Sequence, residues 1–121
     1  MSKVVHFEIN TPDVEKTTAF YGGVFGWQFQ KWDGPEPYWL ITTGEQEAPG
    51  IGGGMMSVKD WPQTVNIVGV DSMNAFTEKI TQHGGELVVE KMASPGVGYS
   101  AYFKDPNGIA FGIFEADKTA A

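Results

Sequence analysis

The feature that most constrains this chain is an internal repeat of about 60 residues. Each half reads as one strand, one helix and three further strands. In the first half these elements fall at 3–9, from 11–13 to about 25, 27–31, 38–43 and 50–57. The second half repeats the order at 63–69, from 71 or 72 to about 83, 86–91, 98–104 and 109–115. One such unit leaves a sheet face bare, so we expect two units to cooperate in enclosing a binding surface.

The first strand shows how the repeat orients its side chains. Val5, Phe7 and Ile9 alternate with His6 and Glu8. Alternation in a strand places the apolar set on a core face and the polar set on the opposite face. The predicted fold class is therefore α+β with two βαβββ modules. We expect one domain over 1–121, with module 1 at about 3–57, a linker at 58–62 and module 2 at about 63–116.

Composition excludes several classes of function. The chain has 121 residues, a formal net charge of -7 and no cysteine, and its eight basic residues are all lysines scattered along the sequence. No basic stripe is present, so nucleic acid is not an expected partner. No apolar run reaches the roughly 20 residues needed to cross a bilayer, and the first ten residues do not resemble a secretory signal. We therefore expect a cytoplasmic protein that is not bound to a membrane.

Three segments together resemble the vicinal oxygen chelate superfamily, which includes glyoxalase I, bleomycin-resistance proteins and extradiol dioxygenases. They are VHFEINTPDVEKTTAFYGGVFGWQF near the start, SMNAFTEKITQHGGEL in the second half and YFKDPNGIAFGIFE near the end. The resemblance implies two βαβββ modules that form a cupped mixed sheet with the helices outside. In the metalloenzymes of this family, the cup holds a divalent metal that chelates two neighbouring substrate oxygens.

The resemblance also assigns four metal-ligand positions, one on the first and last strand of each module. These positions fall on His6, Gly52, Asn66 and Gly112. Only His6 is a ligand of the usual kind, and catalytic zinc usually takes three protein ligands. We therefore expect no metal or other cofactor. A divalent metal held by His6 and Glu8 is the alternative.

Strand alternation predicts which side chains line the cup. His6, Asn66 and Gly112 are expected to face it, whereas Glu115 should project from the opposite face. His83 is read as an exposed residue at the end of the second helix. The full set predicted to line the ligand-binding cup is His6, Glu8, Gly52, Gly54, Asn66, Gly112 and Phe114.

His6 is also the one candidate catalytic residue. It is either a general base or a hydrogen-bonded histidine inherited from a metal-binding ancestor. The glycines at 50–54 remove side-chain volume, which lets a ligand or a neighbouring backbone approach closely. Some strand aromatics could stack on a planar ligand, but the sequence does not say which.

The predicted function is binding of a small organic molecule by a glyoxalase-like and bleomycin-resistance-like homodimer. Whether the protein is an enzyme stays open, although true glyoxalase I activity is not expected. The alternatives are a divergent metal-dependent lyase, isomerase or dioxygenase that uses His6, and a structural or regulatory dimer with an unused cup. The modules could pair within one chain or across the dimer.

Overall fold

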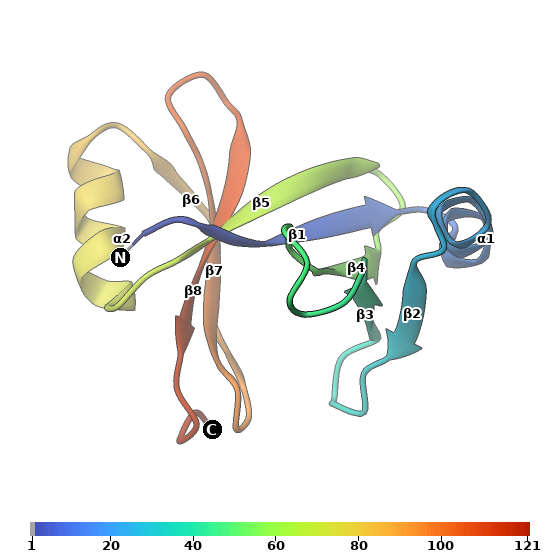
Figure 1. Cartoon of the computed structure of the whole chain (residues 1–121). Helices are drawn as coiled ribbons and strands as arrows, with labels where there is room; N and C mark the ends of the chain where they lie inside the picture. Colours follow the sequence, from blue (N-terminus) through green and yellow to red (C-terminus); the bar gives the residue numbers. More distant parts are fainter. Residues whose placement is uncertain (1) are drawn as a thin grey trace. The chain divides into compact units, whose positions relative to one another are not determined.

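The computed structural model describes residues 2–121 and contains the predicted repeat twice. The first half is built of β1 (Val4–Thr11), α1 (Val14–Phe25), β2 (Gln28–Lys31), β3 (Tyr38–Thr42) and β4 (Gly53–Ser57). The second half is built of β5 (Gln63–Gly69), α2 (Met73–Gln82), β6 (Glu86–Ser94), β7 (Gly98–Lys104) and β8 (Ala110–Ala116). The α+β class and the two βαβββ modules are therefore confirmed (Figure 1).

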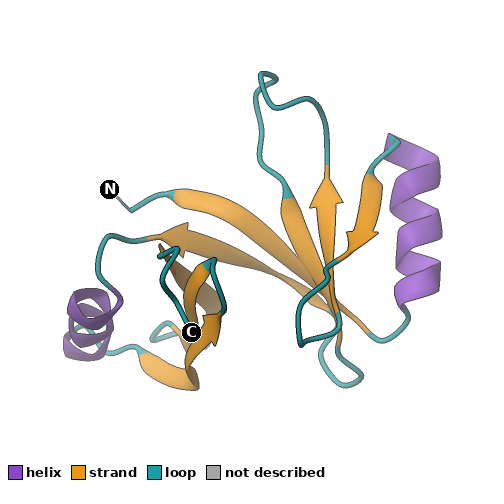
Figure 2. Ribbon diagram, turned by 90° about the horizontal axis from the view of Figure 1, so that it is seen from below, coloured by secondary structure: helices purple, strands orange, loops and turns teal. Residues whose placement is uncertain are grey.

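The chain divides into two compact units. The N-terminal unit is His6–Val65, and the C-terminal unit is Asn66–Ala121 together with the first residues up to Val5. Strand order in the N-terminal unit is β2-β3-β4-β1, and in the C-terminal unit it is β6-β7-β8-β5. In each unit the first strand pairs in parallel with the last, and the other pairs are antiparallel. The same topology therefore occurs twice, and Figure 2 shows the helices and strands coloured by type.

Helix α1 is capped by Asp13 at its N-terminus and by Gly26 at its C-terminus. The side chain of Asp13 accepts a hydrogen bond from the backbone N–H of Lys16, which caps the N-terminus. Gly26 ends the helix in the left-handed region with φ 73°, a conformation that glycine adopts without steric cost. The helix packs on a core in which Ile9, Ile41 and Met55 are buried, with further contacts from Phe7, Val14, Tyr21, Trp27, Phe29 and Trp39.

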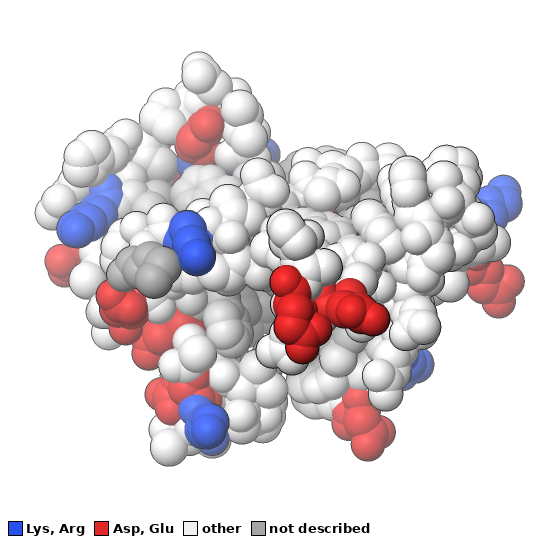
Figure 3. All heavy atoms as spheres, viewed as in Figure 1, with Lys and Arg blue, Asp and Glu red and all other residues white. Residues whose placement is uncertain are grey.

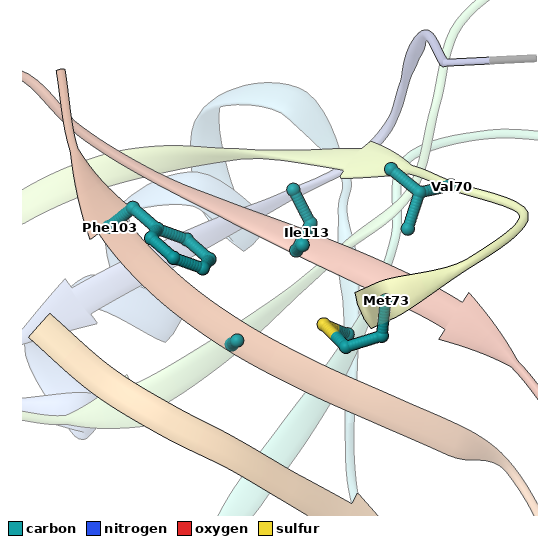
Figure 4. Packing of buried hydrophobic residues seen from close by; sticks show 5 residues of the cluster. Val70, Met73, Phe103 and Ile113 are labelled. Atoms are coloured by element: carbon teal, nitrogen blue, oxygen red, sulfur yellow. The ribbon is translucent and has the colours of Figure 1, made fainter. Parts of the chain in front are cut away.

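The C-terminal unit has its own core between α2 and its strands. The buried members are Val70, Met73, Ala101, Phe103 and Ile113. Figure 4 shows four of these side chains gathered in one cluster. Burying a phenylalanine or methionine side chain stabilises the fold by about 1.5–3 kcal/mol, so this cluster is a main source of stability in the unit.

The largest differences between the predicted and the observed element boundaries are at β4 and β6. β4 begins at Gly53 rather than near residue 50, because the glycine-rich segment before it joins the strand ladder only where Gly53 pairs with Phe7. β6 continues to Ser94 rather than ending near residue 91, because its antiparallel pairing with β7 extends to Gly98 and absorbs two register shifts.

The charged side chains of the surface and the lengths of the two helices bear on possible partners. On the face drawn in Figure 3, lysines are scattered singly among more numerous acidic side chains. Within the described residues, neither helix is long and apolar enough to cross a membrane.

Candidate functional site

β1 presents its polar residues on one face, as its alternation predicts. Ile9 is buried in the core under α1 and Phe7 packs against it. His6 and Glu8 project from the opposite face, where Glu8 is only 6% exposed. A buried carboxylate needs hydrogen-bond donors, so the partners of Glu8 define the site.

Tyr38 of β3 supplies a hydroxyl group that bridges the two polar side chains. Its Oη lies 2.9 Å from His6 Nε2 and donates a hydrogen bond of 3.0 Å to Glu8 Oε2. Tyr38 is 32 residues from His6 in the chain, and the pairing of β3 with β4 and of β4 with β1 brings them together. The site is thus a hydrogen-bonded unit of His6, Tyr38 and Glu8.

The direction of these hydrogen bonds determines the tautomer of His6. Because the hydroxyl hydrogen of Tyr38 points to Glu8, the Tyr38 oxygen accepts, and His6 Nε2–H donates. Burial lowers the pKa of His6 from its ordinary value of 6.5, while the charge of Glu8 acts in the opposite direction. His6 is therefore neutral at physiological pH, with its lone pair on Nδ1.

Tyr38 is held in its protonated form. Burial, the charge of Glu8 and the hydrogen bond to Glu8 all raise the pKa of the phenol. The hydroxyl is therefore a permanent donor to Glu8 across the physiological pH range.

Gly54 of β4 makes room for the Tyr38 ring. Glu8 pairs with Gly54 in the strand ladder, so Gly54 lies between β1 and β3 on the same face as Glu8. A Cβ atom added at Gly54 would collide with the hydroxyl oxygen and the ring of Tyr38. The volume that the glycine leaves is therefore filled by a side chain of the chain itself, rather than left open for a ligand.

The C-terminal unit contains a related arrangement without the polar partners. Gly112 of β8 pairs with Ile67 on one side and with Tyr102 on the other. A Cβ atom at Gly112 would lie 2.6 Å from Ile67 Cδ1 and 2.9 Å from Tyr102 Cε2. Phe114 follows two residues later on the same face. Here Ile67 stands where the N-terminal unit has Glu8.

Two sequence-based placements need correction. Asn66 does not share a face with Gly112, because it pairs with Phe111, whose side chain packs against the core on the α2 side. The reason is the length of the repeat. The N-cap residues of the two helices, Asp13 and Ser72, are one residue closer than the assumed repeat of 60. With this spacing, His6 corresponds to Val65 rather than to Asn66. Asn66 was therefore misplaced by one residue, which in a strand reverses the face.

The ligand position predicted on the last strand of the first module is also wrong by two residues. Gly54, rather than Gly52, holds the position that corresponds to Gly112, because Gly54 pairs with Glu8 as Gly112 pairs with Ile67. Gly52 precedes β4, and a Cβ atom there would meet the carbonyl oxygen of Ile41 at 2.9 Å.

Two other placements are confirmed. Glu115 projects toward α2, where its Oε1 accepts a hydrogen bond of 2.6 Å from the backbone N–H of Met73 at the start of the helix. His83 is exposed at the end of α2 and hydrogen-bonds through Nδ1 to the carbonyl oxygen of Lys79. Both residues thus have structural roles.

Within residues 2–121, no three side chains of His, Cys, Asp or Glu come together in a way that could hold a metal ion. His6 and Glu8 are the two donors near one another, and Tyr38 contacts both. Two protein ligands fall short of the three that catalytic zinc usually has.

Asn10 adds an unmet polar group to the same face of β1. Its Oδ1 is buried and has no hydrogen-bond partner among the described residues. A buried acceptor without a partner costs about 1–3 kcal/mol. A ligand donor that reaches this oxygen would recover part of that free energy.

The sequence indicated that some strand aromatics could contact a ligand, but it did not single out Tyr38 or connect it with His6 and Glu8. The available signal was an aromatic residue in a strand next to a glycine-rich strand, a pairing in which the ring covers the glycine. The bridging hydroxyl itself depends on the strand order and register, which the sequence pattern does not specify.

Comparison with known proteins supports the family suggested by the sequence. The family model for the bleomycin resistance protein-like N-terminal region matches residues 3–44. CFP32 of Mycobacterium bovis, described as a candidate glyoxylase, is 27% identical over 92% of this chain and 44% of its own length. The anthracycline biosynthesis protein DnrV of Streptomyces peucetius is 28% identical over 89% of this chain and 45% of its own length. The chain thus spans less than half the length of these relatives.

Solved structures share the same fold. A methylmalonyl-CoA epimerase in complex with methylmalonyl-CoA and NH4+ superposes with a TM-score of 0.72 at 10% identity, covering 100% of this chain and 99% of the epimerase. The repeated βαβββ topology, the family model and these relatives are all consistent with the resemblance found in the sequence. The chain thus resembles proteins of the vicinal oxygen chelate superfamily in its sequence and shares their fold.

Proposed function

We propose that this protein binds a small organic molecule on the polar face of the N-terminal unit, without a metal held by its own residues. The polar face is the side of β1, β4 and β3 that carries His6, Glu8, Gly54 and Tyr38. The observation that carries the proposal is the Tyr38 hydroxyl, which hydrogen-bonds to both groups that could act as metal ligands. The face then offers hydrogen-bonding and aromatic contacts to a ligand.

The composition of this face supports an organic ligand with both apolar and polar parts. Leu40 lies on it and is 43% exposed, and Trp32 packs edge-on against Tyr38 with ring centroids 6.3 Å apart. The half-buried His6 and the unmet Oδ1 of Asn10 supply polar contacts nearby. Small-molecule sites commonly combine apolar lining with a few polar groups that fix orientation.

Ligand binding is tested by thermal shift with compounds chosen from the names of the relatives. The panel contains methylglyoxal with glutathione, an anthracycline and methylmalonyl-CoA. A ligand present at 100 times its dissociation constant stabilises the folded protein by about 2.7 kcal/mol. We expect at least one compound to raise the melting temperature, and we expect Tyr38→Ala to remove that effect. Exposed Asn74→Ala on α2 is the matched control that should keep it.

Metal content is tested by elemental analysis of the protein as isolated. We expect substoichiometric divalent metal. About one tightly held metal per chain would contradict the proposal.

A divergent metal-dependent lyase, isomerase or dioxygenase is the second candidate. The observation in its favour is that His6 Nε2 and Glu8 Oε2 both point to one atom, the Tyr38 oxygen, at 2.9 and 3.0 Å. Substrate oxygens would then have to complete the coordination of the metal. This candidate predicts a metal-dependent rise in melting temperature that His6→Ala abolishes, and no response to Ni, Zn, Mn or Fe would contradict it.

We also propose that the protein is a cytoplasmic homodimer. The chain has no cysteine, so no disulfide requires an oxidising compartment, and relatives twice as long as this chain have room for a second domain of the same size. Light scattering after size-exclusion chromatography tests the dimer, and a monomer mass at micromolar concentration would refute it.

A further inference from the structure

We infer that Tyr38 excludes divalent metal from this site, because its hydroxyl group occupies the position between His6 and Glu8 that a metal ion would take. The inference extends the proposed function, because it names the residue responsible for a site without metal. It rests on two contacts of Tyr38 and on the glycine beneath it.

The first step is steric. A Cβ atom at Gly54 would collide with the Tyr38 hydroxyl oxygen, so no side chain at position 54 can coexist with the observed Tyr38 rotamer. A carboxylate at this position and the Tyr38 hydroxyl are therefore mutually exclusive. The resemblance implies a metal-ligand position on this strand, and the strand pairing puts Gly54 at the place that corresponds to Gly112.

The second step concerns the lone pairs that a metal needs. A histidine binds metal through an unprotonated nitrogen, but His6 Nε2 carries the hydrogen that it donates to Tyr38. Glu8 Oε2 accepts the Tyr38 hydroxyl hydrogen. A metal held by His6 Nε2 and Glu8 Oε2 would have to displace the phenol from both atoms and change the tautomer of His6.

The third step is that the arrangement occurs twice. In the C-terminal unit, Gly112 also lies against a tyrosine of the antiparallel neighbour strand, Tyr102. Gly112 is one of the four positions at which the resemblance implies a metal ligand. Both glycines thus lie next to a tyrosine ring of the neighbouring strand, which points to a systematic replacement rather than the loss of one ligand.

A double-mutant cycle tests the inference. Tyr38→Ala removes the phenol, Gly54→Glu adds a carboxylate, and the combined variant offers His6, Glu8 and the new carboxylate. Gly44→Glu is the matched control, because a Cβ atom at Gly44 meets nothing within 4 Å. Each protein is dialysed against Mn, Ni or Zn and analysed for bound metal. Far-ultraviolet circular dichroism checks that each variant is folded.

The expected result is bound metal near one equivalent in the combined variant and below a tenth of an equivalent in the wild type and Gly44→Glu. Adding His6→Ala to the combined variant should abolish binding. A folded combined variant that binds no metal would overturn the inference, and so would a wild-type protein that binds one equivalent.

A measurement on the wild-type protein covers the case in which the combined variant does not fold. Nitrogen-15 NMR distinguishes the two neutral tautomers of histidine, and we expect His6 to be protonated at Nε2. Tyr38→Phe should mix the tautomers. If the wild type is protonated at Nδ1 instead, Tyr38 does not hold the site as inferred.

The outcomes separate this inference from the proposed function. A thermal-shift panel without any hit would remove the ligand-binding proposal and leave the role of Tyr38 intact. A wild-type protein that is free of metal but carries the His6 proton on Nδ1 would remove the inferred role of Tyr38 and leave the ligand-binding proposal intact.

Discussion

Replacing Gly54 by alanine should destabilise the protein strongly, although the substitution adds one methyl group. The added Cβ would collide with the Tyr38 hydroxyl oxygen and ring, so Tyr38 must leave its position. Its hydrogen bonds to Glu8 and His6 are then lost. Glu8 is only 6% exposed, so water replaces the lost donor poorly.

The magnitude follows from the two hydrogen bonds. A hydrogen bond to a charged group contributes about 1.5–3 kcal/mol, and one between neutral groups contributes about 0.5–1.5 kcal/mol. Their loss predicts a fall in the free energy of unfolding of about 2–4 kcal/mol. For a chain of this length, that corresponds to a fall in melting temperature of about 8–16 °C.

The assay is urea denaturation at pH 7.5, read by tryptophan fluorescence, for Gly54→Ala, Tyr38→Phe and the combined variant. Tyr38→Phe should lose a similar amount, since it removes the same two hydrogen bonds and keeps the ring. The combined variant should lose less than the sum of the single variants, because the hydroxyl group can be lost only once. Gly44→Ala, at an exposed glycine in open space, is the control and should stay within about 0.5 kcal/mol of the wild type.

The reasoning is refuted if Gly54→Ala is as stable as Gly44→Ala. It is also refuted if the effects of Gly54→Ala and Tyr38→Phe add fully, because independent losses would mean that the glycine does not act through Tyr38.

Three further predictions concern the rest of the chain. Glu115→Ala should cost about 1–2 kcal/mol by removing the acceptor at the start of α2, whereas Glu78→Ala on the exposed side of the helix should cost little, as measured by thermal unfolding. Phe103→Ala should cost about 3–5 kcal/mol, because the side chain is 1% exposed in the C-terminal core, and retention of wild-type stability in urea would contradict that placement. Stability should fall as pH drops below about 6.5, since burial lowers the pKa of folded His6 below that value and the unfolded chain takes up the proton first. His6→Gln should flatten this part of the profile of unfolding free energy against pH, and an unchanged slope between pH 7 and 5 would argue against a buried neutral His6.

Much of the fold could be predicted because it is encoded locally. Alternation in β1 placed His6 and Glu8 opposite Phe7 and Ile9, and the structure confirms this. The same counting placed Glu115 away from Gly112, where it caps α2. Periodicity within one strand needs no knowledge of its neighbours, which is why these predictions succeed.

The prediction for Asn66 failed because it compared the two halves of the chain. A difference of one residue between the repeats reverses the face of a strand, and the repeat length is known from sequence only approximately. The helix caps Asp13 and Ser72 supply the correct spacing.

The sequence by itself determined the repeated βαβββ order and the resemblance to the vicinal oxygen chelate superfamily. These are properties of residue types and of their spacing along the chain. Only the tertiary structure decided that the space left by Gly54 holds the ring of Tyr38 and that one hydroxyl group joins His6 to Glu8. Those contacts join residues about 30 positions apart, and their geometry depends on strand order and register, which arise only when the strands pair.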